Sequence, residues 1–489
     1  MQLVAYGAQD IYLTGNPQIT FFKVVYRRHT NFAVESIEQT FNGSVDFGKR
    51  VTATISRNGD LIQQMYLEVS LPAGSGTTGA KWTYGVGNAL VQKAEIEIGG
   101  QLIDRHYGEW MNIWTELSVP EGKRVGYDDM VGNATSDAHQ QGGVAADSAA
   151  DKLYVPFQFW FNRNPGLALP LIALQYHEVK LNLEIRSLAD LLDSAATPNS
   201  ASLSGGCKLY VDYVYLDTDE RRRFAQVSHE YLIEQVQFTG DETVGSTTQK
   251  KNFTLNFNHP VKELIWVHVT SDNTSAKRWL NFDNNNGGAN DDTFSSCKLQ
   301  LNGHDRFSER DASYFRKVQN LDHHTRVPRT ATVSAGGLGA TATTTVVATS
   351  SAGGTFNSPQ IGVVDNGAGD TQGLVVDSAT TNPAQVLKAS ASGAPLAIGG
   401  SYITVTATTT VSSQTTLNAN LGQYIYTYSF ALSPEEHQPS GTCNFSRIDN
   451  AVLQLDYTGV TAAKNLKVFA VNYNVLRIMS GMGGLAYSN

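Results

Sequence analysis

Apolar and polar residues alternate along much of this chain, in short runs separated by turn-rich spacers. The pattern appears first at 51–56, 64–72, 94–99, 153–161, 179–185 and 209–217. After a charged stretch it returns at 232–240, 251–257, 262–270, 297–303, 424–432, 451–457 and 466–478. Successive side chains of a strand point to opposite faces, so each run predicts a β-strand. Two series of short strands predict two β-sandwiches.

The two series also match in order, which predicts an internal duplication. Residues 96–114 and 299–317 each contain a strand, a Gly turn, an Asp/Arg pair and an acidic-aromatic stretch suited to one or two helical turns. Residues 164–185 and 438–457 each contain a proline, a glycine, an irregular stretch and an alternating strand. The offset grows from about 203 to about 274 residues, so the second copy has gained about 70 residues between the two matches. Periodicity leaves immunoglobulin-like and jelly-roll topologies both open.

These features divide the chain into an expected N-terminal arm at 1–26, a first sandwich at 27–218, a connector at 219–226 and a second sandwich at 227–489. The second sandwich contains an insertion at about 330–423, where Lys388 is the only basic residue and glutamate is absent. Small, uncharged residues are typical of a flexible linker or of a small β-rich projection. Recurring Val/Ile patches favour the projection.

Composition narrows the class of protein. A hydrophobic fraction of 41% with 17% charged residues is globular, and a formal charge of −9 without a long basic run argues against direct nucleic-acid binding. The first twenty residues contain no Lys or Arg and place Asp10 in their weakly apolar stretch, so we expect no signal peptide. Cys207, Cys297 and Cys443 are widely spaced and odd in number, which predicts reduced, partly buried thiols and a reducing compartment.

Candidate chemistry is sparse. GSGTTG at 74–79 matches a dinucleotide-binding pattern, but AKWTYGVGN follows in place of a helix, so a hairpin loop is expected. The stretch DNNNGGANDDTF from Asp283 resembles a calcium loop but has Phe294 where a bidentate Glu belongs. His323 and His324 lack the spacing of a zinc helix, and the charged stretch 217–224 suits a solvated connector. We therefore expect no catalytic, cofactor or metal residues, although paired carboxylates on distant strands leave a glycosidase open as an alternative.

Two surface features have functional alternatives. Five N-x-S/T patterns occur, and Asn133 and Asn273 are the candidate glycosylation sites among them. Because no signal peptide is expected, the default interpretation is that these patterns arise by chance. Arg27, Arg28 and His29 follow an aromatic run. They suit either a solvated strand end or an arm that docks on a neighbouring subunit or an inner layer.

Several longer segments resemble one known family. They read GAQDIYLTGNPQITFFKVVYRRHTNFA at 7–33, ISRNGDLI at 55–62, PGLALPLIALQYHEVKL at 165–181, HEYLIEQVQFTG at 229–240, QPSGTCNFSRIDNA at 438–451 and NYNVLRIMSGMGGLAY at 472–487. Together they closely resemble the major capsid proteins of chlorella viruses and related large nucleocytoplasmic DNA viruses. The resemblance covers both halves and both termini and is weakest in the insertion and in the spacers near 119–152 and 271–296.

The resemblance implies an all-β fold of two tandem, eight-stranded antiparallel jelly rolls with short helices in loops. It implies a structural subunit without enzyme activity or cofactor, which forms a homotrimeric, pseudo-hexagonal capsomer in the outer shell of an icosahedral virion. The implied partners are neighbouring capsomers, minor capsid proteins, an inner membrane layer and, through outer loops, the host surface. Folding and assembly are expected in the host cytoplasm. Some relatives carry glycans outside the usual acceptor pattern.

A rival interpretation belongs to another class of protein. A β-sandwich carbohydrate-binding protein or adhesin would present its loops as the binding surface. Such a protein ordinarily needs a secretion signal and works as a monomer, and it does not require two matching halves of this size. An enzyme would instead show a pocket with convergent carboxylates.

Overall fold

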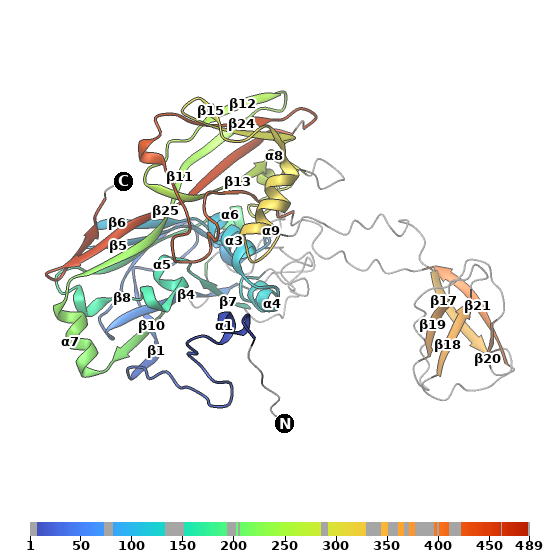
Figure 1. The fold of residues 1–489 in the computed structure, drawn as a ribbon. Helices are drawn as coiled ribbons and strands as arrows, with labels where there is room; N and C mark the ends of the chain where they lie inside the picture. The colour runs from blue at the N-terminus through green and yellow to red at the C-terminus, as the bar shows by residue number, and fades with distance from the viewer. Residues whose placement is uncertain are drawn as a thin grey trace.

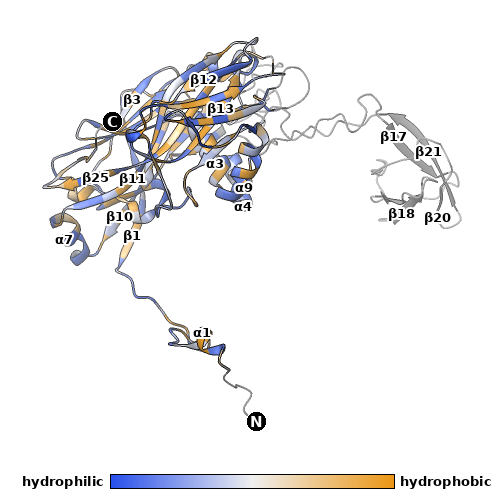
Figure 2. Cartoon of the chain, turned by 45° about the horizontal axis from the view of Figure 1, so that its top comes forward, coloured by the Kyte–Doolittle hydropathy of each residue, from blue (hydrophilic) through white to orange (hydrophobic). Residues whose placement is uncertain are grey.

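The computed structural model contains two β-sandwiches in tandem (Figure 1). It describes residues 7–72, 82–132, 151–192, 202–203, 206–284, 292–328, 344–350, 360–365, 371–376, 396–398, 401–409, 422–460 and 462–487. Apolar residues concentrate along the strands, where the sheets of each sandwich face one another (Figure 2). The alternation seen in the sequence therefore reports buried and exposed strand faces.

The first sandwich, called barrel 1, has two antiparallel sheets. Sheet 1A has the order β1-β10-β4-β7, built from β1 (Phe32–Gln39), β10 (Cys207–Leu216), β4 (Leu61–Leu71) and β7 (Asp151–Pro156), with β8 (Leu169–Pro170) paired to β4. Sheet 1B has the order β2-β3-β9-β5-β6, built from β2 (Phe41–Asn42), β3 (Arg50–Thr54), β9 (Val179–Ile185), β5 (Val91–Ile98) and β6 (Gln101–His106). Neighbours in sheet 1A, and the pairs β3-β9 and β9-β5 of sheet 1B, join strands that are not consecutive in the chain, as a jelly roll requires.

Strand β4 shows how the sequence builds the core of barrel 1. Met65, Leu67 and Val69 are buried in the main hydrophobic cluster, whereas the intervening Tyr66 and Glu68 are only half-buried. Apolar side chains on one face of each sheet can thus leave water together, at about 25 cal/mol for each Å² of apolar surface. Among the described residues, the other face of sheet 1A is covered at Leu61 and Val214, which pack near Phe224, and is exposed at Val34, Ser36 and Glu38.

The second sandwich, called barrel 2, repeats this plan. Sheet 2A has the order β11-β25-β13-β22, built from β11 (His229–Val244), β25 (Lys464–Met479), β13 (Pro260–Thr270) and β22 (Tyr426–Ser429), with β23 (Cys443–Asn444) and β26 (Met482–Leu485) paired alongside. Sheet 2B has the order β12-β24-β14-β15, built from β12 (Lys250–Thr254), β24 (Ala451–Asp456), β14 (Ser296–Leu301) and β15 (His304–Asp305), with β16 (Arg310–Asp311) also paired to β14. The fold is therefore all-β, with two jelly rolls in tandem.

The duplicated turn shows which residues of the two barrels are equivalent. β8 begins at Leu169 and β23 at Cys443, 274 residues later, and each pairs with the equivalent strand of its own barrel, β4 or β13. The 3-10 turns that follow, η2 (Leu171–Ala173) and η5 (Phe445–Arg447), have the same offset. The repeat expected from the sequence thus corresponds to the same structural unit in both barrels.

Short helices occupy the connections between strands. They are α1 (Asp10–Thr14), α2 (Val86–Leu90), α3 (Gly108–Ser118), α4 (Glu121–Met130), α5 (Trp160–Arg163), α6 (Leu188–Leu191), α7 (Thr218–Gln226), α8 (Ser271–Ser275) and α9 (Gln319–His323), with further single turns η1 (Pro165–Leu167) and η3 (Tyr314–Val318). Helix α3 has 11 residues and so exceeds the one or two turns expected. The expected strand at 153–161 was wrong beyond Pro156, because Trp160–Arg163 is helical. None of the described helices has the length and apolar character needed to cross a bilayer.

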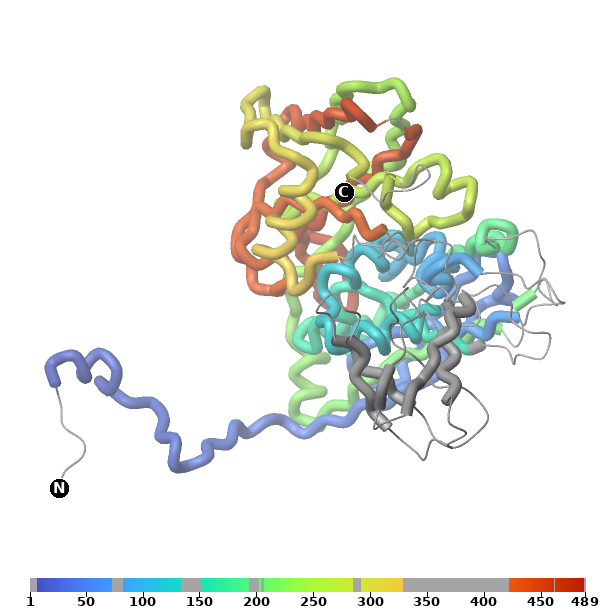
Figure 3. The backbone as a smooth tube through the Cα atoms, turned by 90° about the vertical axis from the view of Figure 1, so that its right-hand side faces the viewer, coloured from blue at the N-terminus to red at the C-terminus, as the bar shows by residue number. Residues whose placement is uncertain are grey.

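The segment before β1 extends away from both barrels (Figure 3). Large apolar side chains along it lie in solvent, including Tyr12 at 92%, Phe21 at 91% and Phe22 at 98% exposure. Arg27, Arg28 and His29 are exposed as well. An apolar segment of this kind, beside a basic cluster, is free to contact another molecule.

Within the insertion, the described backbone forms short strands. They are β17 (Thr344–Ser350), β18 (Gln360–Asp365), β19 (Thr371–Val376), β20 (Leu396–Ile398) and β21 (Ser401–Thr409). β21 pairs with β17 and with β20, and β18 pairs with β19. The Val/Ile patches therefore coincide with strands.

Candidate functional site: the junction between the two barrels

Helix α3 connects the barrels physically, because it leaves barrel 1 and packs on the outer face of sheet 2A. Trp110 is completely buried, and its ring lies 5.4 Å from that of Phe469 on β25, centroid to centroid. Phe469 also stacks on Phe238 of β11 at 4.9 Å, and Tyr107 contacts Phe238 edge-on at 5.1 Å. Ile113, with Trp114 and Leu117, belongs to the same hydrophobic cluster as the core of barrel 2. The helix of one barrel is thus part of the other barrel's core.

Charged side chains from both barrels lie beside the start of α3. Glu109 at the start of α3 is buried and lies 3.1 Å from the guanidinium of Arg186 of barrel 1. Burial raises the pKa of Glu109, but Lys467 of barrel 2 and Arg186 outweigh that effect and lower it below its usual value. Glu109 therefore stays ionised between one cation from each barrel, which compensates its loss of hydration.

A second buried group of charges lies beside Trp114. The Lys262 ammonium of β13 is fully buried and lies 2.7 Å from Glu234 of β11, and Arg163 of barrel 1 lies 3.1 Å from the same carboxylate. The Arg163 guanidinium also covers the ring of Trp114 at 4.1 Å. Burial lowers the pKa of Lys262 and of Arg163. One carboxylate of barrel 2 therefore binds cations from both barrels.

His324, just after α9, also belongs to this buried group of charges. We call the whole group, which is Arg163, Glu234, Lys262, Glu263, His324 and Glu435, the charged layer. Its Nε2 lies 3.0 Å from Glu263 of β13 and its Nδ1 lies 3.0 Å from Glu435. Burial alone would lower the pKa of His324, but the two carboxylates raise it to about 9. The imidazole is therefore protonated at neutral pH and links two acidic groups. Nearby, Arg326 pairs with Glu116 of α3, which again joins barrel 2 to barrel 1.

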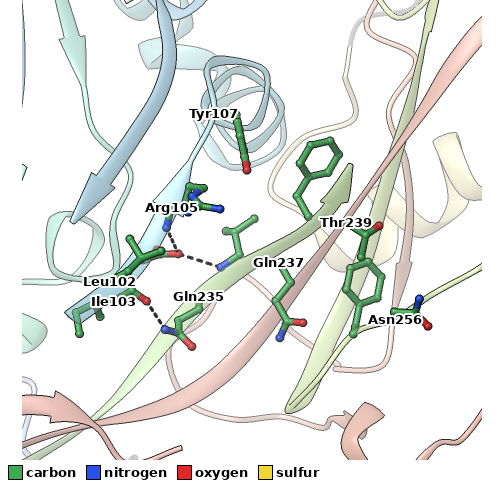
Figure 4. Close-up of a pocket in the computed structure, with 12 residues that line it drawn as sticks. Leu102, Ile103, Arg105, Tyr107, Gln235, Gln237, Thr239 and Asn256 are labelled. Atoms are coloured by element: carbon green, nitrogen blue, oxygen red, sulfur yellow. Dashed lines mark hydrogen bonds between the residues drawn. The ribbon is translucent and has the colours of Figure 1, made fainter. Parts of the chain in front are cut away.

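The barrels also meet along two sheet edges, β6 and β11 (Figure 4). The Gln235 side-chain amide donates to the Ile103 carbonyl, and the backbone N–H of Val236 donates to Asp104 Oδ1 at 3.2 Å. A cavity of about 220 Å³ beside these contacts is lined by Arg105, Tyr107, Gln237 and Asn256, among others. Its lining offers one acid, Asp104, and so lacks the pair of carboxylates that hydrolysis of a glycan needs. These side chains instead close two edges that could otherwise pair with a foreign strand.

The candidate glycosylation sites differ in what the structure says of them. Asn133 lies outside the described residues. Asn273 is 2% exposed, and its side-chain nitrogen donates to the Asn281 carbonyl and to Asp283 Oδ1, both at 3.2 Å. Because a glycan would be attached to that nitrogen, the geometry weighs against Asn273 in the folded chain. Glycosylation stays a prediction for both.

The other sequence candidates are dispersed. Residues 73–81, with the Gly-rich loop, and 285–291 of the calcium-like stretch lie outside the described residues. The adjacent His323 and His324 diverge, since the Nδ1 of His323 contacts the Leu432 carbonyl. Among the described residues, no three His, Cys, Asp or Glu side chains gather as a metal site. The connector forms helix α7, where Arg221 pairs with Asp60 at 3.0 Å.

The three cysteines are free, as the sequence predicted. Cys207 and Cys297 are buried, and Cys443 is half-buried. Burial raises the pKa of Cys207 to about 12, so its thiol is protonated. Sequence reasoning missed the charged residues of the junction. The available signal was the adjacent pair Lys262 and Glu263 near the start of the mainly apolar strand β13.

Comparison with known proteins agrees with this architecture. The family described as "Major capsid protein N-terminus" matches residues 20–217, and the family described as "Large eukaryotic DNA virus major capsid protein" matches 220–334 and 404–484. The major capsid protein of Pyramimonas orientalis virus is 50% identical over 491 residues, which cover 100% of this chain and 99% of the relative. That of Paramecium bursaria Chlorella virus 1 is 39% identical over 541 residues, with the same coverage.

Solved structures agree as well. A chain of the PBCV-1 virus capsid is 35% identical, covers 96% of this chain and 100% of its own length, and has a TM-score of 0.63. The Faustovirus major capsid protein has a TM-score of 0.61 at 11% identity, covering 97% of this chain and 94% of its own, which shows the fold alone. Two barrels joined by a buried junction, together with these matches along both halves, show that the chain belongs to the family of large eukaryotic DNA virus major capsid proteins, the double jelly-roll subunits of capsids.

Proposed function

We propose that three copies of this chain assemble into a pseudo-hexagonal capsomer that tiles the icosahedral shell of a large DNA virus. The observation that carries the proposal is the repeated sheet order, β1-β10-β4-β7 in barrel 1 and β11-β25-β13-β22 in barrel 2. Two similar barrels in each of three chains provide six similar blocks around one axis, which suits a near-hexagonal lattice. Many weak lateral contacts between such blocks then hold the shell together.

The test is the mass of the purified chain, measured by light scattering coupled to size exclusion. A stable species at three times the 53.0 kDa chain mass is the expected result. A folded monomer over a wide concentration range would contradict the trimer.

We further propose that the subunit is divided at the connector, with the arm at 1–26, barrel 1 at 27–218, the connector at 219–226 and barrel 2 at 227–489. The exposed apolar residues of the arm support a position inside the shell, against minor capsid proteins or an inner membrane layer. The insertion at about 330–423 is proposed as an outer projection toward the host. Limited proteolysis of intact particles tests this orientation, because cleavage in the arm with the insertion left uncut would contradict it.

The role is structural rather than catalytic, with assembly in the host cytoplasm and no direct contact with nucleic acid. The cavity between β6 and β11 supports a non-enzymatic role, since Asp104 is the one carboxylate in its lining. Mass spectrometry of virion-derived protein tests whether Asn133 or Asn273 carries a glycan. Fluorescence microscopy of infected cells tests where newly made subunits gather.

A further inference from the structure

The two equivalent sheets of the chain differ in what covers their outer faces. On sheet 2A, Phe469 lies opposite Ile265 and Phe238, and α3 covers this row. On sheet 1A, Tyr210 lies opposite Tyr66 and Glu38 in the corresponding row. The two rows also correspond in sequence, because KLYV at 208–211 matches KVFA at 467–470. Within the chain, no helix equivalent to α3 lies on the row at Tyr210 among the described residues.

Barrel 2 has its own counterpart of α3. Helix α3 follows β6, which pairs with β5, and the segment η3–α9 follows β16, which pairs with β14 in the same way. Every residue of α3 from Gly108 to Leu117 is buried, because the helix lies between its own barrel and the neighbouring one. In contrast, η3–α9 exposes Val318 at 42% and Leu321 at 71%. A surface hollow of about 410 Å³ lies beside it, lined by residues that include Tyr314 and Lys317.

We propose that the segment Tyr314–His323 of one copy packs on the outer face of sheet 1A of a second copy. The contact would reproduce between chains the one that α3 makes with sheet 2A inside each chain. Since each barrel would then offer one helical side and one sheet side, the arrangement is head-to-tail, and such contacts close into a ring when the rotation fits. This inference rests on the proposed trimer and names the surfaces that form it.

The open face of sheet 1A has the chemistry of a protein interface. Tyr66 stacks on Tyr210 at 5.3 Å and lies 6.2 Å from Tyr154, centroid to centroid. Val34 of β1, on the same face, is 50% exposed. Rigid aromatic side chains of this kind are enriched in interface cores, because they bury a large area and lose little conformational entropy. The exposed apolar side chains of η3–α9 would supply the complementary surface.

Charge substitutions on the two surfaces test the contact. Leu321→Glu changes the helical side and Tyr210→Glu the sheet side, and Met482→Glu on β26, where Met482 is 52% exposed, serves as the matched control. Circular dichroism confirms folding, and light scattering gives the mass over a concentration series. We expect the wild type and Met482→Glu at three chain masses. The other two variants should assemble at least about tenfold more weakly, because burying an unpaired carboxylate opposes association.

Mixing the two defective variants sharpens the test. Tyr210→Glu retains its helical side and Leu321→Glu retains its sheet side, so one intact contact forms and we expect a species at twice the chain mass. If Tyr210→Glu fails to fold, Val34→Glu replaces it. Variants that remain trimeric, or a mixture that stays at one chain mass, would overturn the proposed contact while the trimer stands. A wild type that is monomeric throughout would overturn the trimer and this contact with it.

Discussion

Sheet 1A and sheet 2A have the same strand order but opposite surroundings. Strand β4 of sheet 1A alternates between buried and half-buried residues from Met65 to Leu71, whereas every residue of β13 from Val261 to Thr270 is buried. The difference arises because α3 and the charged layer around His324 cover the second face of sheet 2A. A duplicated unit can therefore keep its topology while one copy becomes a platform for its neighbour.

The comparison also separates two kinds of charge. Lys208 on sheet 1A pairs with Glu38 at 3.0 Å in the open, while Lys262 on sheet 2A pairs with Glu234 out of contact with solvent. Exposed pairs contribute little to stability, but removing one partner of a buried pair leaves an uncompensated charge. Equivalent sheets should therefore respond very differently to similar substitutions.

The largest effect is expected at Trp110. Trp110→Ala would leave a cavity between α3 and sheet 2A and lower the free energy of unfolding by about 3–5 kcal/mol. Tyr210→Ala, at the corresponding row of the open sheet 1A, should cost a monomer much less. Denaturant unfolding of both variants, monitored by circular dichroism, makes the comparison. Equal losses would mean that α3 does not support barrel 2.

A loss of about 3 kcal/mol is expected for Lys262→Met, because among the described residues Glu234 would then keep Arg163 alone as an ion-pair partner in a buried site. Lys208→Met, at the exposed pair, is the matched control and should have the same denaturant midpoint as the wild type. The measurement is the denaturant midpoint of each variant. A stabilised Lys262→Met would show that apolar packing replaces this ion pair at no cost.

His324 makes stability depend on pH. Its pKa is raised from 6.5 to about 9 in the folded chain, so its contribution is fully present below pH 6.5 and is lost as pH rises through 9. Between those values, the wild type should lose on the order of 3 kcal/mol relative to His324→Gln. Thermal unfolding of both proteins across this range measures the difference. Parallel pH profiles would mean that Glu263 and Glu435 do not hold the proton.

The smallest effect is expected where the sheet edges meet. Gln235→Ala removes the donor to the Ile103 carbonyl, which should cost about 1–2 kcal/mol because that acceptor is buried. Ser36→Ala removes the 3.2 Å hydrogen bond to the Tyr66 hydroxyl on the open face and should change stability by less than about 0.5 kcal/mol. Hydrogen exchange measures the protection of the backbone amides of Ile103 and Val236, which lie where β6 and β11 meet. Unchanged protection there would contradict a role for Gln235 in joining the barrels.

Much of the fold follows from local pattern. Alternation in β4 and β24, the turns at Leu171–Ala173 and Phe445–Arg447, and the strands of the insertion are each visible in a few consecutive residues. The residues of the candidate site were harder to predict from the sequence. Asn273 matches a glycosylation pattern by its neighbours in sequence, yet its burial depends on Asn281 and Asp283, which fold over it.

The sequence by itself determined the all-β class and the duplication, because strand faces and turns depend on neighbouring residues. Only the tertiary structure decided that Trp110 of one barrel belongs to the core of the other. It also decided that the two ring nitrogens of His324 face two carboxylates, Glu263 and Glu435. Packing and electrostatics act through space, and residues of the same type in the two copies acquired different roles once one outer face was covered and the other was left open.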